Sequence, residues 1–373
     1  MIKYIYIIFT IALVSCKPHT SIGKVDIEID PDVSKKVLLT DLFSDIDVKE
    51  IKCSDSLFFG NIDFIKSYGS YIFLQDQFQT KSITVINTLN NNTYQLKKRG
   101  KGPGEYLNLD AFTFDEDNQL IYLYERGIGF NIYNFPDFKH IKRIRYNEYL
   151  MNIELLEEEM LILSEKNTKE GFYEGVQLLN IENLNQSSFN LPNHSATIEL
   201  SYPNTITKNV DSLYYASAGY LNKIFMFSGK KVKEKYSISF GEYNIPEEYW
   251  IYDEANKFEE IFAIKECATW IHNFIDASNY ISFCYIFNNP SNKHFVYHNL
   301  EKNISQNISE FVLDEKGNSI GMPIGTYKNK SVFLIYPEEI SEILPNLLIE
   351  NKLRNHLENC LENNNPALLL CEI

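Results

Sequence analysis

The segment Arg99–Glu125, RGKGPGEYLNLDAFTFDEDNQLIYLYE, decides the fold class. Three glycines and a proline fall within the five residues that follow Arg99. This composition is typical of a tight chain reversal, because glycine adopts positive φ and proline fixes φ near −65°. The acidic turn Asp115–Asn118 then precedes the aromatic, β-type run Leu120–Glu125. The segment therefore predicts a reversal that leads into strands.

A phosphate-binding loop does not fit the same glycines. Such a loop requires Gly-Lys-Ser/Thr after a strand, whereas Gly102 follows Lys101 here. The dinucleotide-binding pattern also fails, because Glu105 stands in the place of the third glycine and its carboxylate would repel a phosphate. Pro103 has no N–H to donate. The sequence therefore gives no sign of a nucleotide site at this turn.

Groups of short β-type runs recur along the chain. Each group is interpreted as an apolar inner strand, then a strand of alternating character, then a more polar outer strand. The leading runs are Tyr71–Asp76, Leu120–Glu125, Met160–Glu165, Ser212–Ser217, Tyr280–Phe287 and Ser331–Tyr336. Their spacing of roughly 40–70 residues is near that of propeller blades. The sequence predicts an all-β, six-bladed β-propeller with short helical insertions and a C-terminal helix.

Two stretches depart from the strand pattern, and the chain ends offer a way to close the ring. Ile245–Cys267 is compatible with a helical insertion, and Leu347–Leu361 has the leucine spacing of an amphipathic helix. An open ring would expose unpaired strand edges. We therefore expect the terminal run Ala367–Ile373 to complete a sheet that begins near Val48–Cys53.

The glycine motif also carries a family resemblance. Residues 99–125 resemble the Gly-x-Gly-Pro-Gly-Glu-Tyr segment of the six-bladed β-propeller lipoproteins of Gram-negative bacteria, and Asn365–Leu368 resembles the final Asn-Pro-x-Leu strand of that family. The similarity in pattern extends over essentially the whole mature chain. The resemblance implies a propeller fold and an envelope location, with the motif placed after the outer strand of an early blade. It implies no reaction.

The N-terminus has the features of an export signal. A lysine at position 3 precedes a short apolar run, and Leu13–Cys16 (LVSC) resembles the lipobox of bacterial lipoproteins. The predicted organisation is a lipoprotein signal peptide at residues 1–15, a lipid-anchored tether at 16–24 and the propeller domain at 25–373. Cys16 is the predicted lipidation site, and an ordinary signal peptide is the alternative. The predicted location is the outer membrane, facing either the periplasm or the surface.

Charge and cysteine content limit the partners. The net charge of −15 disfavours nucleic acid and anionic lipid head groups, so membrane attachment is expected through the N-terminal lipid. The other five cysteines form no zinc-type spacing, and Cys284, within YISFCYIF, is predicted to be buried. No cofactor and no metal are predicted.

Several residues are candidates for a site. His294 and His298 could share a strand face, but no third metal ligand is identifiable, so strand packing is favoured. The acidic run at 115–117 lacks the calcium-loop pattern and is favoured as a hairpin turn. Trp250 and Trp270 are favoured as packing residues over a sugar-stacking platform. A blade-connecting loop is favoured over a channel-mouth site for a last set: Arg99, Lys101, Glu105 and Tyr106.

Two functions remain open at this level. The absence of any catalytic motif favours a lipid-anchored binding module for a protein or glycan partner in the cell envelope, with no catalytic residues assigned. The alternative is an envelope glycan hydrolase or lyase with carboxylates at the propeller funnel. A deep central pocket with converging carboxylates or histidines and perturbed pKa values would favour the enzyme, and a shallow, aromatic or flat mouth would favour binding.

Overall fold

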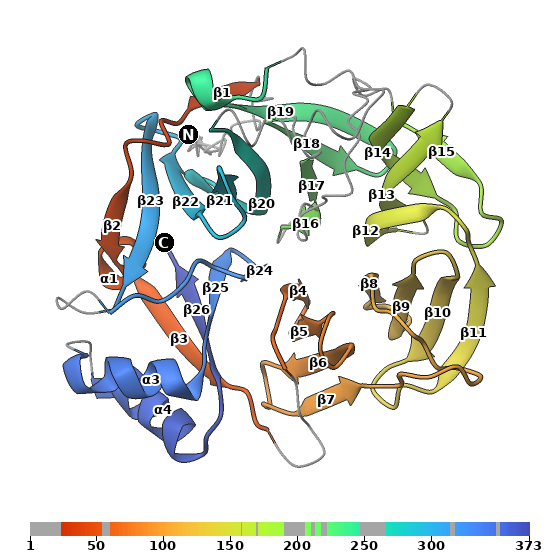
Figure 1. Cartoon of the computed structure of the whole chain (residues 1–373), viewed down its shortest axis with the longest axis horizontal. Coiled ribbons are helices and arrows are strands. Elements are labelled where there is room, and N and C mark those ends of the chain that lie inside the picture. Colours follow the sequence, from red (N-terminus) through yellow and green to blue (C-terminus); the bar gives the residue numbers. More distant parts are fainter. Residues whose placement is uncertain are drawn as a thin grey trace, which may run out of the picture.

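The computed structural model describes residues 24–53, 60–157, 159–168, 171–189, 206–209, 213–217, 222–246, 266–313, 318–347 and 351–373. Six sheets are arranged as a ring, with the innermost strands facing a common centre (Figure 1). This arrangement is a six-bladed β-propeller, as the sequence predicted. In the described residues no helix is long and apolar enough to cross a membrane.

The first three blades are sheets of four consecutive strands. The first contains β4 (Phe64–Tyr68), β5 (Tyr71–Asp76), β6 (Ser82–Asn87) and β7 (Thr93–Leu96). The second contains β8 (Ala111–Asp115), β9 (Leu120–Glu125), β10 (Gly129–Asn134) and β11 (His140–Arg145). The third contains β12 (Tyr149–Leu156), β13 (Glu159–Thr168), β14 (Gly171–Leu179) and β15 (Gln186–Ser188).

The next two blades each gain a fifth strand from the N-terminal part of the chain. The fourth contains β16 (Ile206–Lys208), β17 (Tyr214–Ser217), β18 (Lys223–Ser228) and β19 (Lys231–Ser239). The fifth contains β20 (Ala268–Asp276), β21 (Tyr280–Phe287), β22 (Lys293–Asn299) and β23 (Ile304–Val312). Parallel to their outer strands lie β1 (Val25–Glu28) on β19 and β2 (Lys35–Leu38) on β23.

The sixth blade joins the two ends of the chain. Its strand order is β24 (Gly325–Tyr327), β25 (Lys330–Ile335), β26 (Ala367–Glu372) and β3 (Asp45–Glu50). The terminal strand β26 pairs antiparallel with β3 from Ala367 opposite Glu50 to Glu372 opposite Asp45. The expectation that the terminal strand completes a sheet begun near the N-terminus is therefore confirmed.

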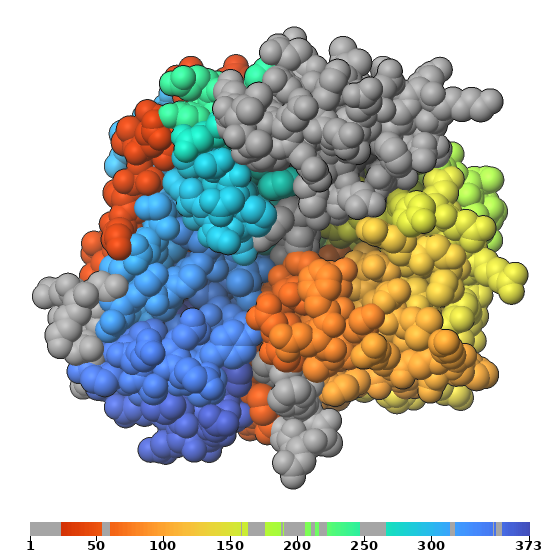
Figure 2. Space-filling view, viewed as in Figure 1, coloured from red at the N-terminus to blue at the C-terminus, as the bar shows by residue number. Residues whose placement is uncertain are grey.

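The helices are short and lie outside the ring. They are α1 (Leu39–Leu42), the 3-10 turn η1 (Gly241–Tyr243), α3 (Pro337–Ile343), the 3-10 turn η3 (Leu344–Asn346) and α4 (Asn351–Glu362). The α3 and α4 helices lie at the outer side of the sixth blade, beside β3 (Figures 1 and 2). The predicted C-terminal helix is α4, with Leu353 and Leu357 buried. Most of the predicted insertion Ile245–Cys267 lies outside the described residues.

The strand order within a blade corrects one detail of the sequence interpretation. The predicted leading runs are the second strands of the blades, and a further strand precedes each of them on the inside of the ring. The second strand has an apolar sequence because it is covered on both faces: β21, for example, is buried throughout. Several innermost strands are short or polar, such as β16 (ITK) and β24 (GTY), and resemble loops in sequence.

The core lies between adjacent blades. Between the first and second blades, the ring centroids of Phe73 and Phe114 are 5.0 Å apart, and those of Phe73 and Phe135 are 6.3 Å apart. Between the sixth and first blades, a Cβ atom at Gly325 would lie 2.6 Å from Cβ of Ile65, so the two innermost strands are in close contact. These two blades also lie against each other in the space-filling view (Figure 2).

Candidate functional site

The glycine-rich turn connects the outer strand of the first blade to the second blade. The Tyr106 side chain is fully buried, and its hydroxyl donates to the Lys81 carbonyl at 2.7 Å. Burial raises the pKa of this hydroxyl. The Glu105 carboxylate accepts the Gly102 N–H at 2.7 Å, within the turn. A Cβ atom at Gly104, where φ is +75°, would lie 2.6 Å from Cβ of His140, so this position requires glycine. The motif holds two blades together.

The structure places the predicted channel-mouth residues away from the centre of the ring. Arg99 and Lys101 are exposed on the turn, whereas Glu105 and Tyr106 have the contacts given above. None of the four is among the described residues that line a cavity of about 720 Å³ at the centre of the ring. Cys16 lies outside the described residues.

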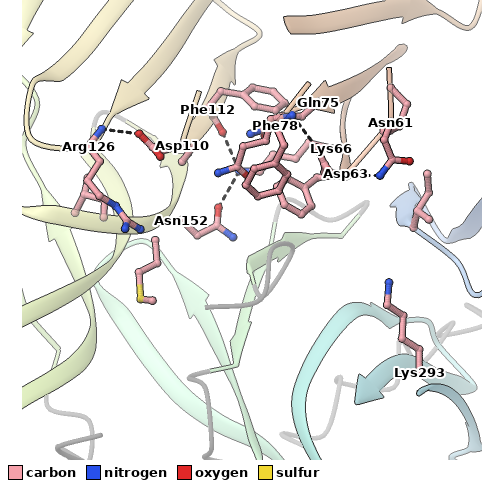
Figure 3. A pocket seen from close by; sticks show the side chains of 17 residues that line it. Asn61, Asp63, Lys66, Gln75, Phe78, Asp110, Phe112, Arg126, Asn152 and Lys293 are labelled. Atoms are coloured by element: carbon pink, nitrogen blue, oxygen red, sulfur yellow. Dashed lines mark hydrogen bonds between the residues drawn. The ribbon is translucent and has the colours of Figure 1, made fainter. Parts of the chain in front are cut away.

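A cavity of about 720 Å³ lies where the innermost strands of several blades begin (Figure 3). We call it the channel cavity. The first blade contributes residues just before and within β4 and from the β5–β6 turn, and the second contributes the start of β8 and the β9–β10 turn. The start of β12, Ile324 and Lys293 complete the described lining. In Figure 3, Arg126 and Lys293 lie on different sides of the cavity.

Two aspartates position the cavity turns by the same contact in successive blades. Asp63 precedes β4 and accepts the backbone N–H of Gln77 at 2.8 Å. Asp110 precedes β8 and accepts the backbone N–H of Arg126 at 2.7 Å. Burial raises the pKa of Asp63. Each carboxylate thereby fixes the turn that carries a residue of the cavity rim.

The rim itself presents an aromatic ring and a cation. The Phe78 side chain is 69% exposed although it lines the cavity. The Arg126 guanidinium lies 5.5 Å from the ring centroid of Tyr149, which is 51% exposed. Exposed aromatic rings next to a concave polar surface are typical of recognition sites.

A buried ion pair lies below the cavity. Lys66 Nζ contacts Glu154 Oε2 at 3.2 Å and donates to the carbonyls of Ile153 at 2.7 Å and Phe112 at 2.9 Å. Glu154 also accepts the hydroxyls of Tyr68 and Thr113, each at 3.0 Å. Burial lowers the pKa of Lys66 and raises that of Tyr68. This cluster joins the first three blades at the centre of the ring.

Two further spaces lie on the side of the Lys66–Glu154 cluster that faces away from the channel cavity. A small space of about 20 Å³ lies beside Lys66 and Glu154. Beyond it, a cavity of about 410 Å³ is lined by residues at the other ends of the innermost strands, among them Tyr68, Glu116 and Lys208. Lys208 and Glu116 form an ion pair at 3.3 Å. The Lys66–Glu154 cluster therefore lies between two cavities, one at the start of the innermost strands and the other at the opposite ends of these strands.

The histidines are held by hydrogen bonds within the fifth blade. His294 Nδ1 lies 3.0 Å from the Tyr285 hydroxyl, and His298 Nδ1 lies 2.9 Å from Ser305 Oγ. Burial lowers the pKa of both imidazoles. In the part of the chain that the structure describes, no three potential metal-ligating side chains come together.

Three other candidate positions are structural. Asp115 accepts the N–H of Asn118 at 3.0 Å, which is the predicted hairpin turn. Trp270 is buried in β20, as favoured from the sequence, and Trp250 lies outside the described residues. Cys284 is fully buried, as predicted.

Sequence reasoning missed the residues that form the channel cavity and the cluster below it. Lys66 and Glu154 are charges within apolar strand sequences, FIKSY and YLMNIELL. An isolated charge in such a run is a signal for a buried pair, because an unpaired charge is costly to bury. Phe78 and Arg126 belong to short turns, where sequence alone gives no position relative to the centre.

Comparison with known families identifies the chain by sequence. The family described as a domain of unknown function (DUF4934) matches residues 23–372. The chain belongs to this family. No curated protein sequence matches it.

One solved structure shows the same fold, and a second is reported as a weaker similarity. A Bacteroides fragilis protein named "Putative exported protein" superposes with a TM-score of 0.72 at 15% identity, covering 94% of this chain and 99% of that one. Kuenenia stuttgartiensis hydrazine synthase superposes with a TM-score of 0.39 at 10% identity, covering 86% and 90%. The first of these supports the six-bladed propeller.

Proposed function

We propose that this DUF4934 chain is a lipid-anchored propeller of the cell envelope that binds a protein or glycan partner through the channel cavity. The observation that carries the proposal is the cavity rim, where the exposed ring of Phe78 and the guanidinium of Arg126 border an open space of about 720 Å³ that is lined by both polar and apolar residues. Cavities of several hundred Å³ with a few positioned polar groups are common ligand sites.

The envelope location is supported by two observations. Leu13–Cys16 has the lipobox pattern, and the B. fragilis propeller with the same fold is named as an exported protein. The net charge of −15 disfavours nucleic acid as the partner. Attachment through the lipid would involve none of the residues that line the channel cavity.

The test compares cavity variants with matched surface variants. The full mature chain in detergent micelles is titrated with purified envelope glycans and peptides by calorimetry. Phe78→Ala/Arg126→Ala should weaken binding by about tenfold or more, because aromatic and arginine anchors dominate recognition. Thermal stability should change little, since both side chains are exposed. The control is Leu89→Ala/Arg145→Ala, which removes an exposed leucine and an exposed arginine away from the cavity.

Unchanged affinity in the cavity variant would contradict the proposal. An enzymatic function remains the second candidate, because Asp63 has a raised pKa inside the cavity. Release of new reducing ends from a glycan by the wild type, lost in Asp63→Asn, would favour the hydrolase or lyase. The backbone hydrogen bonds of Asp63 and Asp110 instead favour a positioning role for both carboxylates.

A further inference from the structure

Amide side chains are frequent in the lining of the channel cavity. Asn61, Gln75, Gln77 and Asn152 all contribute to it. A primary amide both donates and accepts hydrogen bonds, as does each hydroxyl of a saccharide. The lining also contains apolar residues such as Ile62 and Met151, so it suits a ligand that has both hydroxyl groups and C–H faces.

The orientation of the Asn152 amide is set by its neighbours. Its Oδ1 accepts Lys66 Nζ at 3.1 Å and the backbone N–H of Ile153 at 2.9 Å. The oxygen is therefore fixed toward the two donors. The Nδ2 donor has no acceptor among the described residues, although the side chain is only 4% exposed. Buried donors are normally satisfied, so a ligand that offers an oxygen acceptor fits this position.

Arg126 provides a cation at the rim. Its backbone N–H is bound by Asp110, and its guanidinium lies over the Tyr149 ring. No carboxylate of the described residues lies within 4.0 Å of this guanidinium. Lys293 also lines the cavity, on another side (Figure 3). Because a guanidinium matches a carboxylate with two parallel hydrogen bonds, Arg126 can select an acidic group.

The exposed ring of Phe78 supplies an apolar surface next to these polar groups. Ring carbons of a hexose present a flat C–H face that packs on an aromatic ring, and this contact removes apolar area from water. A sugar that stacks on Phe78 while its substituents reach Asn152 and Arg126 would use all three features of the cavity.

We infer that the ligand of the channel cavity is an acidic saccharide, whose carboxylate binds Arg126 and whose ring packs on Phe78. The inference rests on the proposed binding function and adds the chemical class of the ligand. It gives the arginine and the phenylalanine separate roles, charge selection and ring stacking.

The test pairs each acidic probe with the neutral methyl ester of the same sugar. Trimers of galacturonate, glucuronate and mannuronate and their neutral methyl esters are titrated into the full mature chain by calorimetry at 20 mM and 200 mM salt. At least one acid should bind about ten- to a hundredfold more tightly than its ester, the range expected for hydrogen bonds to a charged group. The preference should shrink at the higher salt concentration.

The variants separate the two roles. Arg126→Gln should remove the preference for the acid over the ester, and Phe78→Ala should weaken the acid and the ester equally. Arg145→Gln, an exposed arginine on β11, should change neither. Equal binding of acids and esters, or a preference that survives Arg126→Gln, would overturn the inference.

The remaining outcomes distinguish this inference from the proposed function. If no saccharide binds, while Phe78→Ala or Arg126→Gln still weakens binding of a peptide or protein, the acidic saccharide is wrong and the binding function stands. If neither variant changes the binding of any saccharide, peptide or protein, both the acidic-saccharide inference and the proposed binding function are wrong.

Discussion

At the scale of single residues, Lys66–Glu154 is the most deeply buried ion pair among the described residues. The Lys66 and Glu154 side chains are 10% and 5% exposed, so both charges are removed from water. The surrounding carbonyls and hydroxyls satisfy the remaining hydrogen bonds of each ion. Such a pair contributes little net stability compared with apolar residues, but removing one partner leaves an uncompensated charge.

Lys66→Met should therefore lower the free energy of unfolding by about 3–5 kcal/mol. Adding Glu154→Gln should recover about 1–3 kcal/mol of that loss, because the amide is neutral and its one oxygen still accepts one of the two hydroxyls, Tyr68 or Thr113, that the carboxylate binds through separate oxygens. Urea denaturation of the single and double variants measures both values.

The matched control is Lys142→Met, at an exposed position on β11, which should stay within about 0.5 kcal/mol of the wild type. A double variant less stable than Lys66→Met alone would show that Glu154 is not held by charge pairing.

At the scale of elements, the terminal strand β26 fills both interfaces of the sixth blade. Leu369 belongs to the core cluster that contains Phe295 and Phe333. Leu368 and Leu370 belong to the cluster that contains Ile65 and Ile72 of the first blade. The alternating side chains of one strand thus pack toward the fifth blade on one face and the first blade on the other.

Deletion of Pro366–Ile373 should strongly lower the melting temperature and raise protease sensitivity. The reason is that β25 and β3 would each lose the strand with which they form backbone hydrogen bonds. A milder change is Leu369→Ala, which should lower the free energy of unfolding by about 2–5 kcal/mol, because apolar burial is lost and a cavity remains. Leu89→Ala, where the side chain is 83% exposed, is the control. A truncated chain that melts at the wild-type temperature would refute closure by this strand.

At the scale of the whole molecule, the fold could be predicted from sequence and the site could not. Tyr71–Asp76 and Tyr280–Phe287 have clear apolar patterns because sheets cover both of their faces. The ring closure followed from the exposed edge that an unpaired Ala367–Ile373 would leave. By contrast, Lys66 and Glu154 are 88 positions apart and meet only because the innermost strands converge. The channel cavity depends on this convergence as well, so no local spacing indicates it.

If Cys16 carries the proposed lipid, the position of the ring relative to the membrane depends on the tether that follows this residue. Only residues 17–24 separate it from β1, which pairs on the outer edge of the fourth blade. Eight extended residues reach at most about 30 Å. A lipid on Cys16 would therefore keep the outer edge of this blade near the bilayer.

Cys16→Ser tests this arrangement. Without the acylated thiol, the chain should appear in the soluble fraction or accumulate as the precursor, because the acyl chains supply the membrane affinity through buried methylenes at about 0.8 kcal/mol each. Cell fractionation and mass spectrometry of the N-terminal peptide give the readout. Cys53→Ser removes an exposed thiol of the propeller and should leave the chain in the membrane fraction. Normal processing and membrane retention of Cys16→Ser would mean that the chain is held by another contact, and the tether would not limit the distance between ring and bilayer.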